Sequence, residues 1–247
     1  MKRWALLITT ATSALFAHPS ASSAIAPATQ GAADNTRIIV KVLVNGVAPV
    51  PATIQATADP YCMEAHEEEP LLSQTVQVGA DGALIDSLVF VSDGVSRTYA
   101  APLTPVRLDQ KGCAYSPHVI GMMVGQPLQI MNGDATLHTI HPLSAINPSF
   151  NLALPIQGRT QTRVFTKPEP VFRIKCDVHP WMSAYLATFA HPFFGVSNRQ
   201  GIVELSSLPA GTFQIKAWHE KYGVQTQSVS VSAGETKQIT VTYKGSV

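Results

Sequence analysis

The sequence predicts an all-β fold. Apolar and polar residues alternate along several short segments, and turn signals such as Asn45-Gly46 and Asp93-Gly94 separate these segments. No helical pattern of useful length follows the N-terminal leader. The chain has 247 residues, which is enough for one large domain or two to three small ones.

The N-terminus is typical of a secretory signal. Two basic residues precede an apolar stretch over residues 4–16, and residues 21–24 offer a cleavage site of small side chains. A membrane anchor is the alternative, but the apolar stretch is shorter than the ~20 residues that a membrane span needs. We therefore expect residues 1–24 to be a signal peptide, residues 25–35 to be a linker, and the mature protein to be periplasmic or secreted, without a membrane span.

Residues 36–103 are expected to form an N-terminal β region. Residues 37–44 alternate cleanly between apolar and polar and end at an Asn-Gly turn, so they predict a strand. Further strands are predicted at residues 52–58, 75–78 and 83–91.

Residues 104–191 are expected to form a second β domain. Strands are predicted within residues 119–132, 163–165, 171–175 and 183–190. This order places Cys176 at the end of one strand and starts the last strand of the domain shortly after it.

Residues 192–247 are expected to form a C-terminal β domain. Its short strands are predicted at residues 201–205, 211–220, 225–231 and 236–243. Because four short strands give a thin core, an alternative is that the N-terminal strands pack with them. In that alternative the middle domain is inserted between two halves of one sandwich.

A group of residues in the middle domain has the chemistry of a copper site. Cys176, His179 and Met182 follow one another at short spacing, and His138 lies upstream, six positions after Asn132. Two imidazoles, one thiolate and a weak axial thioether suit a metal that cycles between Cu(I) and Cu(II). Zinc is the alternative metal, but there is no second cysteine pair and a Met ligand does not suit zinc. Ordinary core packing of the cysteine and the methionine is the other alternative, and the joint spacing favours copper.

These residues resemble the ligand motifs of the cupredoxins, the blue copper family, and especially its amicyanin-like and plastocyanin-like members. The short loop Cys-x2-His-x2-Met of such proteins corresponds to Cys176, His179 and Met182. Their upstream strand and turn correspond to residues 125–132, which lead to His138. The resemblance implies that His138, Cys176, His179 and Met182 are copper ligands.

The resemblance covers about residues 104–191 and implies a Greek-key β-sandwich. One position departs from the pattern, because Thr139 stands where an Asn usually ties the two ligand loops together. In such proteins the second ligand histidine, here His179, lies at the surface within an apolar patch, to which Pro180 and Trp181 would contribute. Trp181 is therefore our candidate for the docking of a redox partner protein.

The flanking regions resemble exported proteins that join such a copper domain to a smaller carboxypeptidase-regulatory-like, or transthyretin-like, β-sandwich. Proteins of this kind are sometimes labelled methylamine-utilisation proteins. That label implies no particular activity.

Three cysteines in an exported chain leave one thiol over once a disulfide forms. If Cys176 binds copper, Cys62 and Cys113 remain as the pair that an oxidising compartment would join. Two separate free thiols are the alternative.

Other polar residues near the motif have less direct roles. We expect His118 and His141 to pack or to form hydrogen bonds near the site, with direct ligation as the alternative. Asp134 and Asp177 are expected to orient the ligand loops. A Met-rich Cu(I) site is an alternative to core packing for Met63, Met122, Met123 and Met131.

Composition and motifs narrow the function. Charged residues make up only 13% of the chain and its net charge is +1, so nucleic acid is not expected as a partner. No hydrolase, phosphate-binding or zinc-protease motif is present, and a four-ligand copper leaves no open position for substrate, so we do not expect an enzyme. The sequence predicts an exported type 1 copper protein that transfers single electrons between redox partners. The alternatives are a copper-handling protein without electron transfer and a β-sandwich binding module without metal.

Overall fold

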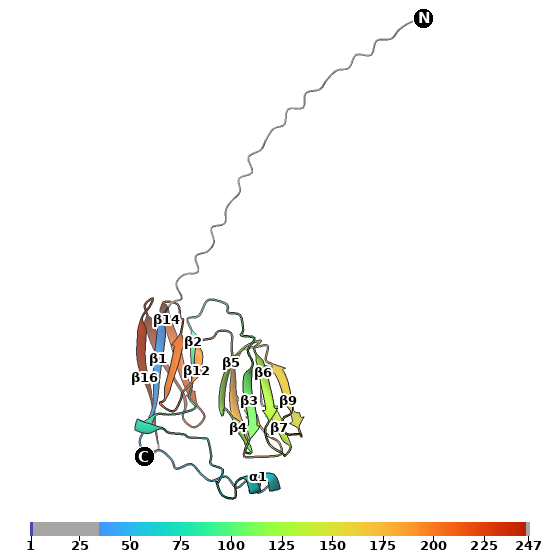
Figure 1. The fold of residues 1–247 in the computed structure, drawn as a ribbon. Helices are drawn as coiled ribbons and strands as arrows, with labels where there is room; N and C mark the ends of the chain where they lie inside the picture. Colours follow the sequence, from blue (N-terminus) through green and yellow to red (C-terminus); the bar gives the residue numbers. More distant parts are fainter. Residues whose placement is uncertain (2–34, 246–247) are drawn as a thin grey trace. The chain divides into compact units, whose positions relative to one another are not determined.

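The computed structural model describes Met1 and residues 35–245, which are almost entirely β (Figure 1). Besides its strands, this part contains the short helix α1 (Pro60–Ala65) and the single 3-10 turn η1 (Ala80–Gly82). The predicted all-β fold class is therefore confirmed. Apart from their end residues, the predicted signal peptide and linker lie outside the described residues. None of the helices in the described residues is long and apolar enough to cross a membrane.

Strands from the two ends of the chain form the first sandwich. These strands are β1 (Arg37–Asn45), β2 (Leu88–Asp93), β12 (Phe194–Val196), β13 (Ile202–Ser206), β14 (Gly211–His219), β15 (Gly223–Val231) and β16 (Thr236–Lys244). They lie in a three-stranded sheet, β13-β1-β16, and a four-stranded sheet, β12-β2-β14-β15. Figure 1 shows the blue strand β1 among the orange and red strands of the C-terminal region.

The core of the first sandwich explains this shared arrangement. Every second side chain of β1, from Ile38 to Val44, is buried, and these side chains pack against apolar residues of the C-terminal strands such as Val203 and Phe213. Residues 36–103 and 192–247 therefore contribute to the same two sheets, as in the alternative arrangement considered above. The domain boundaries themselves stay a prediction.

The strands of the middle region form a second sandwich. They are β3 (Val106–Lys111), β4 (Ala114–Ser116), β5 (Val119–Met123), β6 (Pro127–Asn132), β7 (His138–Pro142), β8 (Leu152–Leu154), β9 (Thr160–Val164), β10 (Glu169–Lys175) and β11 (Ser183–Phe189). The sheets are β4-β3-β6-β9 and β5-β11-β10-β7-β8, and the chain crosses repeatedly from one to the other, as in a Greek-key sandwich. Cys176 and Met182 belong to the buried core between these sheets.

The strand predictions between β1 and β2 were partly wrong. Residues 52–58 and 75–78 form only isolated bridges, Thr53 with Leu72 and Val78 with Leu84, and β2 begins at Leu88 rather than at residue 83. The physical reason is that backbone groups here bond within local turns, as where the N–H of Gly79 donates to the carbonyl of Ala83 around η1 (2.8 Å).

Residues 52–73, which we call the α1 cap, form a closed loop between β1 and β2. Backbone hydrogen bonds from Ile54 N to Leu71 O (2.7 Å) and from Ser73 N to Ala52 O (2.8 Å) close its base. Its buried Cys62 is joined to Cys113 of the second sandwich, so the predicted disulfide is confirmed. The α1 cap is thereby attached to the second sandwich, although the strands at its two ends belong to the first.

Candidate metal centre

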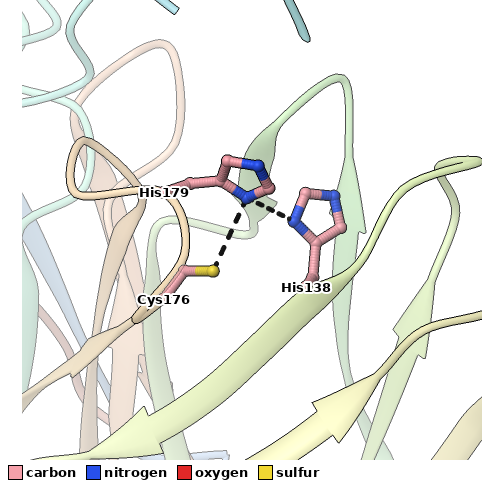
Figure 2. Close-up of side chains that lie close together, drawn as sticks. All are labelled: His138, Cys176 and His179. Carbon is pink, nitrogen blue, oxygen red and sulfur yellow. Dashed lines mark hydrogen bonds between the residues drawn. The ribbon is translucent and has the colours of Figure 1, made fainter. Parts of the chain in front are cut away.

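Three potential ligands converge at one end of the second sandwich (Figure 2). His138 begins β7, Cys176 directly follows β10, and His179 lies in the loop between β10 and β11. The Nδ1 atoms of the two histidines are 2.9 Å apart, and the Cys176 Sγ lies 3.6 Å from Nδ1 of His179. All three side chains are buried.

The short loop after β10 is closed by its own backbone. The N–H of Cys176 donates to the carbonyl of Met182 (3.2 Å), and the N–H of Met182 donates to the carbonyl of His179 (2.9 Å). The Cys-x2-His-x2-Met spacing therefore corresponds to one compact turn. Met182 is buried in the same core as Cys176, and its role as an axial ligand stays a prediction.

A carboxylate lies beside the outer nitrogen, Nε2, of each imidazole. Asp134 Oδ2 lies 2.9 Å from His138 Nε2, and Asp59 Oδ2 lies 3.3 Å from His179 Nε2. An ionised carboxylate only accepts hydrogen bonds, so each carboxylate favours a proton on the Nε2 beside it and thereby leaves the lone pair of Nδ1 for a metal ion. The two Nδ1 atoms lie 2.9 Å apart, a separation at which they can share either a proton or a metal ion.

The spacing of these donors fits a single metal ion. Metal–nitrogen bonds of about 2.0 Å and metal–sulfur bonds of about 2.3 Å place donor atoms on one ion roughly 3–4 Å apart. The separations of 2.9 Å and 3.6 Å agree with this spacing. Two imidazoles and a thiolate are the donor set of a blue-copper site.

The thiol of Cys176 is already deprotonated for metal binding, whereas the imidazole of His138 must release a proton when a metal binds. Burial acts to raise the pKa of Cys176, but hydrogen bonds with His138, His179 and Thr139 outweigh it and lower that pKa to about 5. Burial acts to lower the pKa of His138, but Asp134 and Cys176 raise it to about 8. At neutral pH Cys176 is therefore a thiolate, the form that binds metals.

Thr139 ties the two ligand loops together. Its backbone N–H and its hydroxyl lie 3.4 and 3.6 Å from the Cys176 Sγ, and its Oγ1 accepts from the N–H of Asp177 (2.7 Å). Its carbonyl accepts from the hydroxyl of Tyr115 and from Nε2 of Gln110. The threonine that departs from the usual Asn thus still joins β7 to the loop after β10.

The expectation that His179 lies at the surface is wrong. Its side chain is only 1% exposed, because Asp59 and Cys62 of the α1 cap lie over its outer edge, with Cys62 Sγ 3.7 Å from Nε2. Trp181 also packs against this imidazole, with ring centroids 5.1 Å apart, and donates its indole N–H to the carbonyl of Cys113 (3.1 Å). The apolar surroundings of His179 are therefore part of a covered interior.

The other residues singled out in the sequence lie at different distances from the centre. Asp134 also accepts from the N–H groups of Gly112 and Cys113 and so orients a loop as expected. Asp177 instead pairs with His141 (3.0 Å) at the surface. His118 is buried and hydrogen-bonds to Glu220 of the first sandwich, and it is not one of the three converging donors.

Sequence reasoning missed Asp59. An Asp before Pro60 is a recognisable helix N-cap, and the side chain does accept from the N–H groups of Tyr61 and Cys62. Nothing in the local sequence indicates that the same carboxylate also contacts His179.

Comparisons with known proteins give only remote similarities. No protein-family model and no curated protein matches the chain. Among solved structures, the copper-containing nitrite reductase of Thermus scotoductus SA-01 is 22% identical with a TM-score of 0.33, over 40% of this chain and 25% of that chain. A purple cupredoxin from Nitrosopumilus maritimus is 22% identical with a TM-score of 0.29, over 34% of this chain and 98% of that chain.

An amicyanin variant in its Cu(I) form is 17% identical with a TM-score of 0.31, over 34% of this chain and 82% of that chain. The chain therefore spans a quarter of the length of the nitrite reductase and most of the length of the two smaller proteins. At these values the similarities do not assign a function, and none supports the regulatory-like resemblance of the flanking regions.

Proposed function

We propose that this chain is an exported mononuclear type 1 copper protein that carries single electrons between redox partners. The observation that carries the proposal is the meeting of His138 Nδ1, His179 Nδ1 and Cys176 Sγ, while both Nε2 atoms are held by carboxylates. Copper bound there would supply a one-electron Cu(II)/Cu(I) couple, with Met182 as the proposed axial ligand.

The surroundings favour fast electron transfer because they hold the ligands still. His138 and His179 are each fixed at the outer nitrogen, and Cys176 accepts hydrogen bonds from Thr139. Ligands that cannot rearrange keep a geometry between the preferences of Cu(I) and Cu(II), so little reorganisation accompanies transfer. With Met182 as the proposed fourth ligand, the site would have no open position for substrate, which supports a carrier rather than an enzyme.

Partner docking is proposed near Trp181. The indole ring is half-buried and contacts the imidazole of His179, so it connects the covered ligand to the surface. Pro180 and Val178 are exposed beside it, and Val178 keeps 39% of its surface accessible. A small apolar patch of this kind suits a transient redox complex.

One observation favours the second candidate, a copper-handling protein without electron transfer. The α1 cap covers His179, the ligand that the cupredoxin resemblance places at the surface. A covered ion is protected from exchange, which suits storage or delivery as well as electron transfer.

The absorption spectrum of the metal-free protein after addition of Cu(II) distinguishes these functions. An intense visible thiolate-to-copper band supports the type 1 carrier. Copper that binds without this band supports handling, and the absence of copper binding supports a β-sandwich module without metal.

A further inference from the structure

Asp59 connects the α1 cap to the candidate metal centre through both of its carboxylate oxygens. Oδ1 accepts from the N–H groups of Tyr61 (2.8 Å) and Cys62 (3.2 Å) and so caps helix α1. Oδ2 lies 3.3 Å from His179 Nε2 and accepts from the hydroxyl of Thr136 (2.7 Å). One side chain thus fixes the start of the helix and the outer edge of a ligand imidazole.

Asp134 makes a matching set of contacts on the other side of the disulfide. It accepts from His138 Nε2 (2.9 Å) and from the N–H of Cys113 (2.9 Å). Asp59 likewise contacts the N–H of Cys62, and Cys62 is bonded to Cys113. The disulfide therefore links the two loops that hold the outer nitrogens of the two imidazoles.

We propose that Asp59 is a positioning residue of the metal centre, supplied by the α1 cap from outside the second sandwich. Its carboxylate holds His179 as the Nε2–H tautomer, so that Nδ1 faces His138 Nδ1 and Cys176 Sγ. The importance of this tautomer for copper depends on the proposed function, but the tautomer itself does not.

Burial makes the contact with Asp59 necessary. His179 is 1% exposed, so water does not replace the carboxylate as the acceptor for its Nε2–H. The other near atom, Cys62 Sγ at 3.7 Å, belongs to a disulfide and is a weak acceptor. A buried donor without an acceptor costs about 1–3 kcal/mol, so without Asp59 the ring is expected to change tautomer or rotate.

Two substitutions of Asp59 separate positioning from helix capping. In Asp59→Ser the shorter side chain still caps α1 but does not reach His179. In Asp59→Asn the one remaining oxygen can still cap α1, but the amide NH2 then takes the place of Oδ2 and cannot accept from Nε2–H of His179. Glu64→Gln is the matched control, because Glu64 is an exposed carboxylate of the same helix and the substitution removes one negative charge, as Asp59→Asn does.

The first measurement is the long-range ¹H–¹⁵N spectrum of the imidazoles in the metal-free, disulfide-intact full chain. We expect a larger Nε2–H fraction for His179 in the unmodified protein and in Glu64→Gln than in Asp59→Ser and Asp59→Asn. The second measurement is copper affinity in competition with a chelator, where Asp59→Ser should lose 10-fold or more.

The proposal would be overturned if Asp59→Ser left both the tautomer of His179 and the copper affinity of the protein unchanged. A changed tautomer in Glu64→Gln would also overturn it, because the effect would then come from charge or from loosening of the cap. If the unmodified protein binds no copper, the proposed function fails, and the tautomer of the metal-free protein still decides the role of Asp59.

Discussion

The hydroxyl of Thr139 lies 3.6 Å from the Sγ of Cys176 and at the same time accepts a hydrogen bond from the backbone N–H of Asp177. One side chain thus connects β7 with both the thiolate and the residue after it. Because donors to a thiolate reduce its donation to Cu(II), this contact is expected to raise the reduction potential.

Thr139→Val keeps the shape of the side chain and removes the hydroxyl. We expect the metal-free protein to lose about 1–2 kcal/mol of unfolding free energy, because the N–H of Asp177 loses its acceptor. We also expect a lower reduction potential. Denaturant unfolding and voltammetry measure the two effects, and Thr139→Ser, which keeps the hydroxyl, is the control. An unchanged potential in Thr139→Val would show that the hydroxyl does not influence the thiolate.

Cys176→Ser should abolish the blue band after copper loading, because Cys176 supplies the only thiolate in the candidate centre. The fold should persist, since serine is close in size to cysteine. Visible absorption and far-ultraviolet circular dichroism test these two expectations. A band of unchanged intensity would exclude Cys176 as a ligand.

Met182→Leu should leave copper bound and coloured but raise the reduction potential. Removal of a weak axial donor destabilises Cu(II) more than Cu(I). The side chain is 2% exposed, and leucine conserves most of its volume, so the core should tolerate the change. If voltammetry gives the same potential for both proteins, Met182 is a core residue and does not bind the metal.

Loss of the disulfide should destabilise the protein. Cys62 and Cys113 are separated by 51 positions, and the loop-entropy relation gives about 4 kcal/mol for a loop of this size. The double variant Cys62→Ala and Cys113→Ala should lose an amount of this order in denaturant unfolding. In the unmodified, unreduced and metal-free protein, alkylation under denaturing conditions should add a single label, at Cys176. Three labels would contradict the disulfide.

Acid should remove the stabilisation contributed by Glu169. Its carboxylate accepts from the N–H groups of Ala145, Ile146 and Asn147 and from the hydroxyl of Ser144. Burial acts to raise its pKa, but these hydrogen bonds outweigh burial and lower the pKa from 4.5 to about 2. The stabilisation is complete above pH 4.5 and is lost as the pH falls through about 2.

The difference between the folded and unfolded pKa values corresponds to about 3 kcal/mol. Urea unfolding of the metal-free protein at several pH values between 6 and 2 should therefore show a smaller acid loss in Glu169→Gln than in the unmodified chain. Equal losses in the two proteins would assign the acid sensitivity to other carboxylates.

Long strands with a regular alternation were predicted best. β1 and β16 each have nine residues, and both were expected. β4, β8 and β12 have three residues each and were missed, because three residues do not establish a period of two. β3 and β7, of six and five residues, were missed as well, and β7 shows no alternation because four of its five residues are buried.

The ligand motif could be predicted because Cys176, His179 and Met182 lie close together in the sequence, and such a short spacing restricts how the loop can fold. The α1 cap that covers the loop could not be predicted, because it comes from a distant part of the chain. Cys62 lies 117 positions before His179. The wrong expectation of an exposed His179 and the absence of Asp59 from the predicted site therefore have the same cause.

The α1 cap also depends on both ends of the chain for its place. It precedes all of the proposed ligands in the sequence, yet the strands at its two ends, β1 and β2, pair with β12, β13, β14 and β16. Such non-local pairing is slow and comes late in folding. We therefore expect the α1 cap to reach its final position over His179 only after the C-terminal strands have paired.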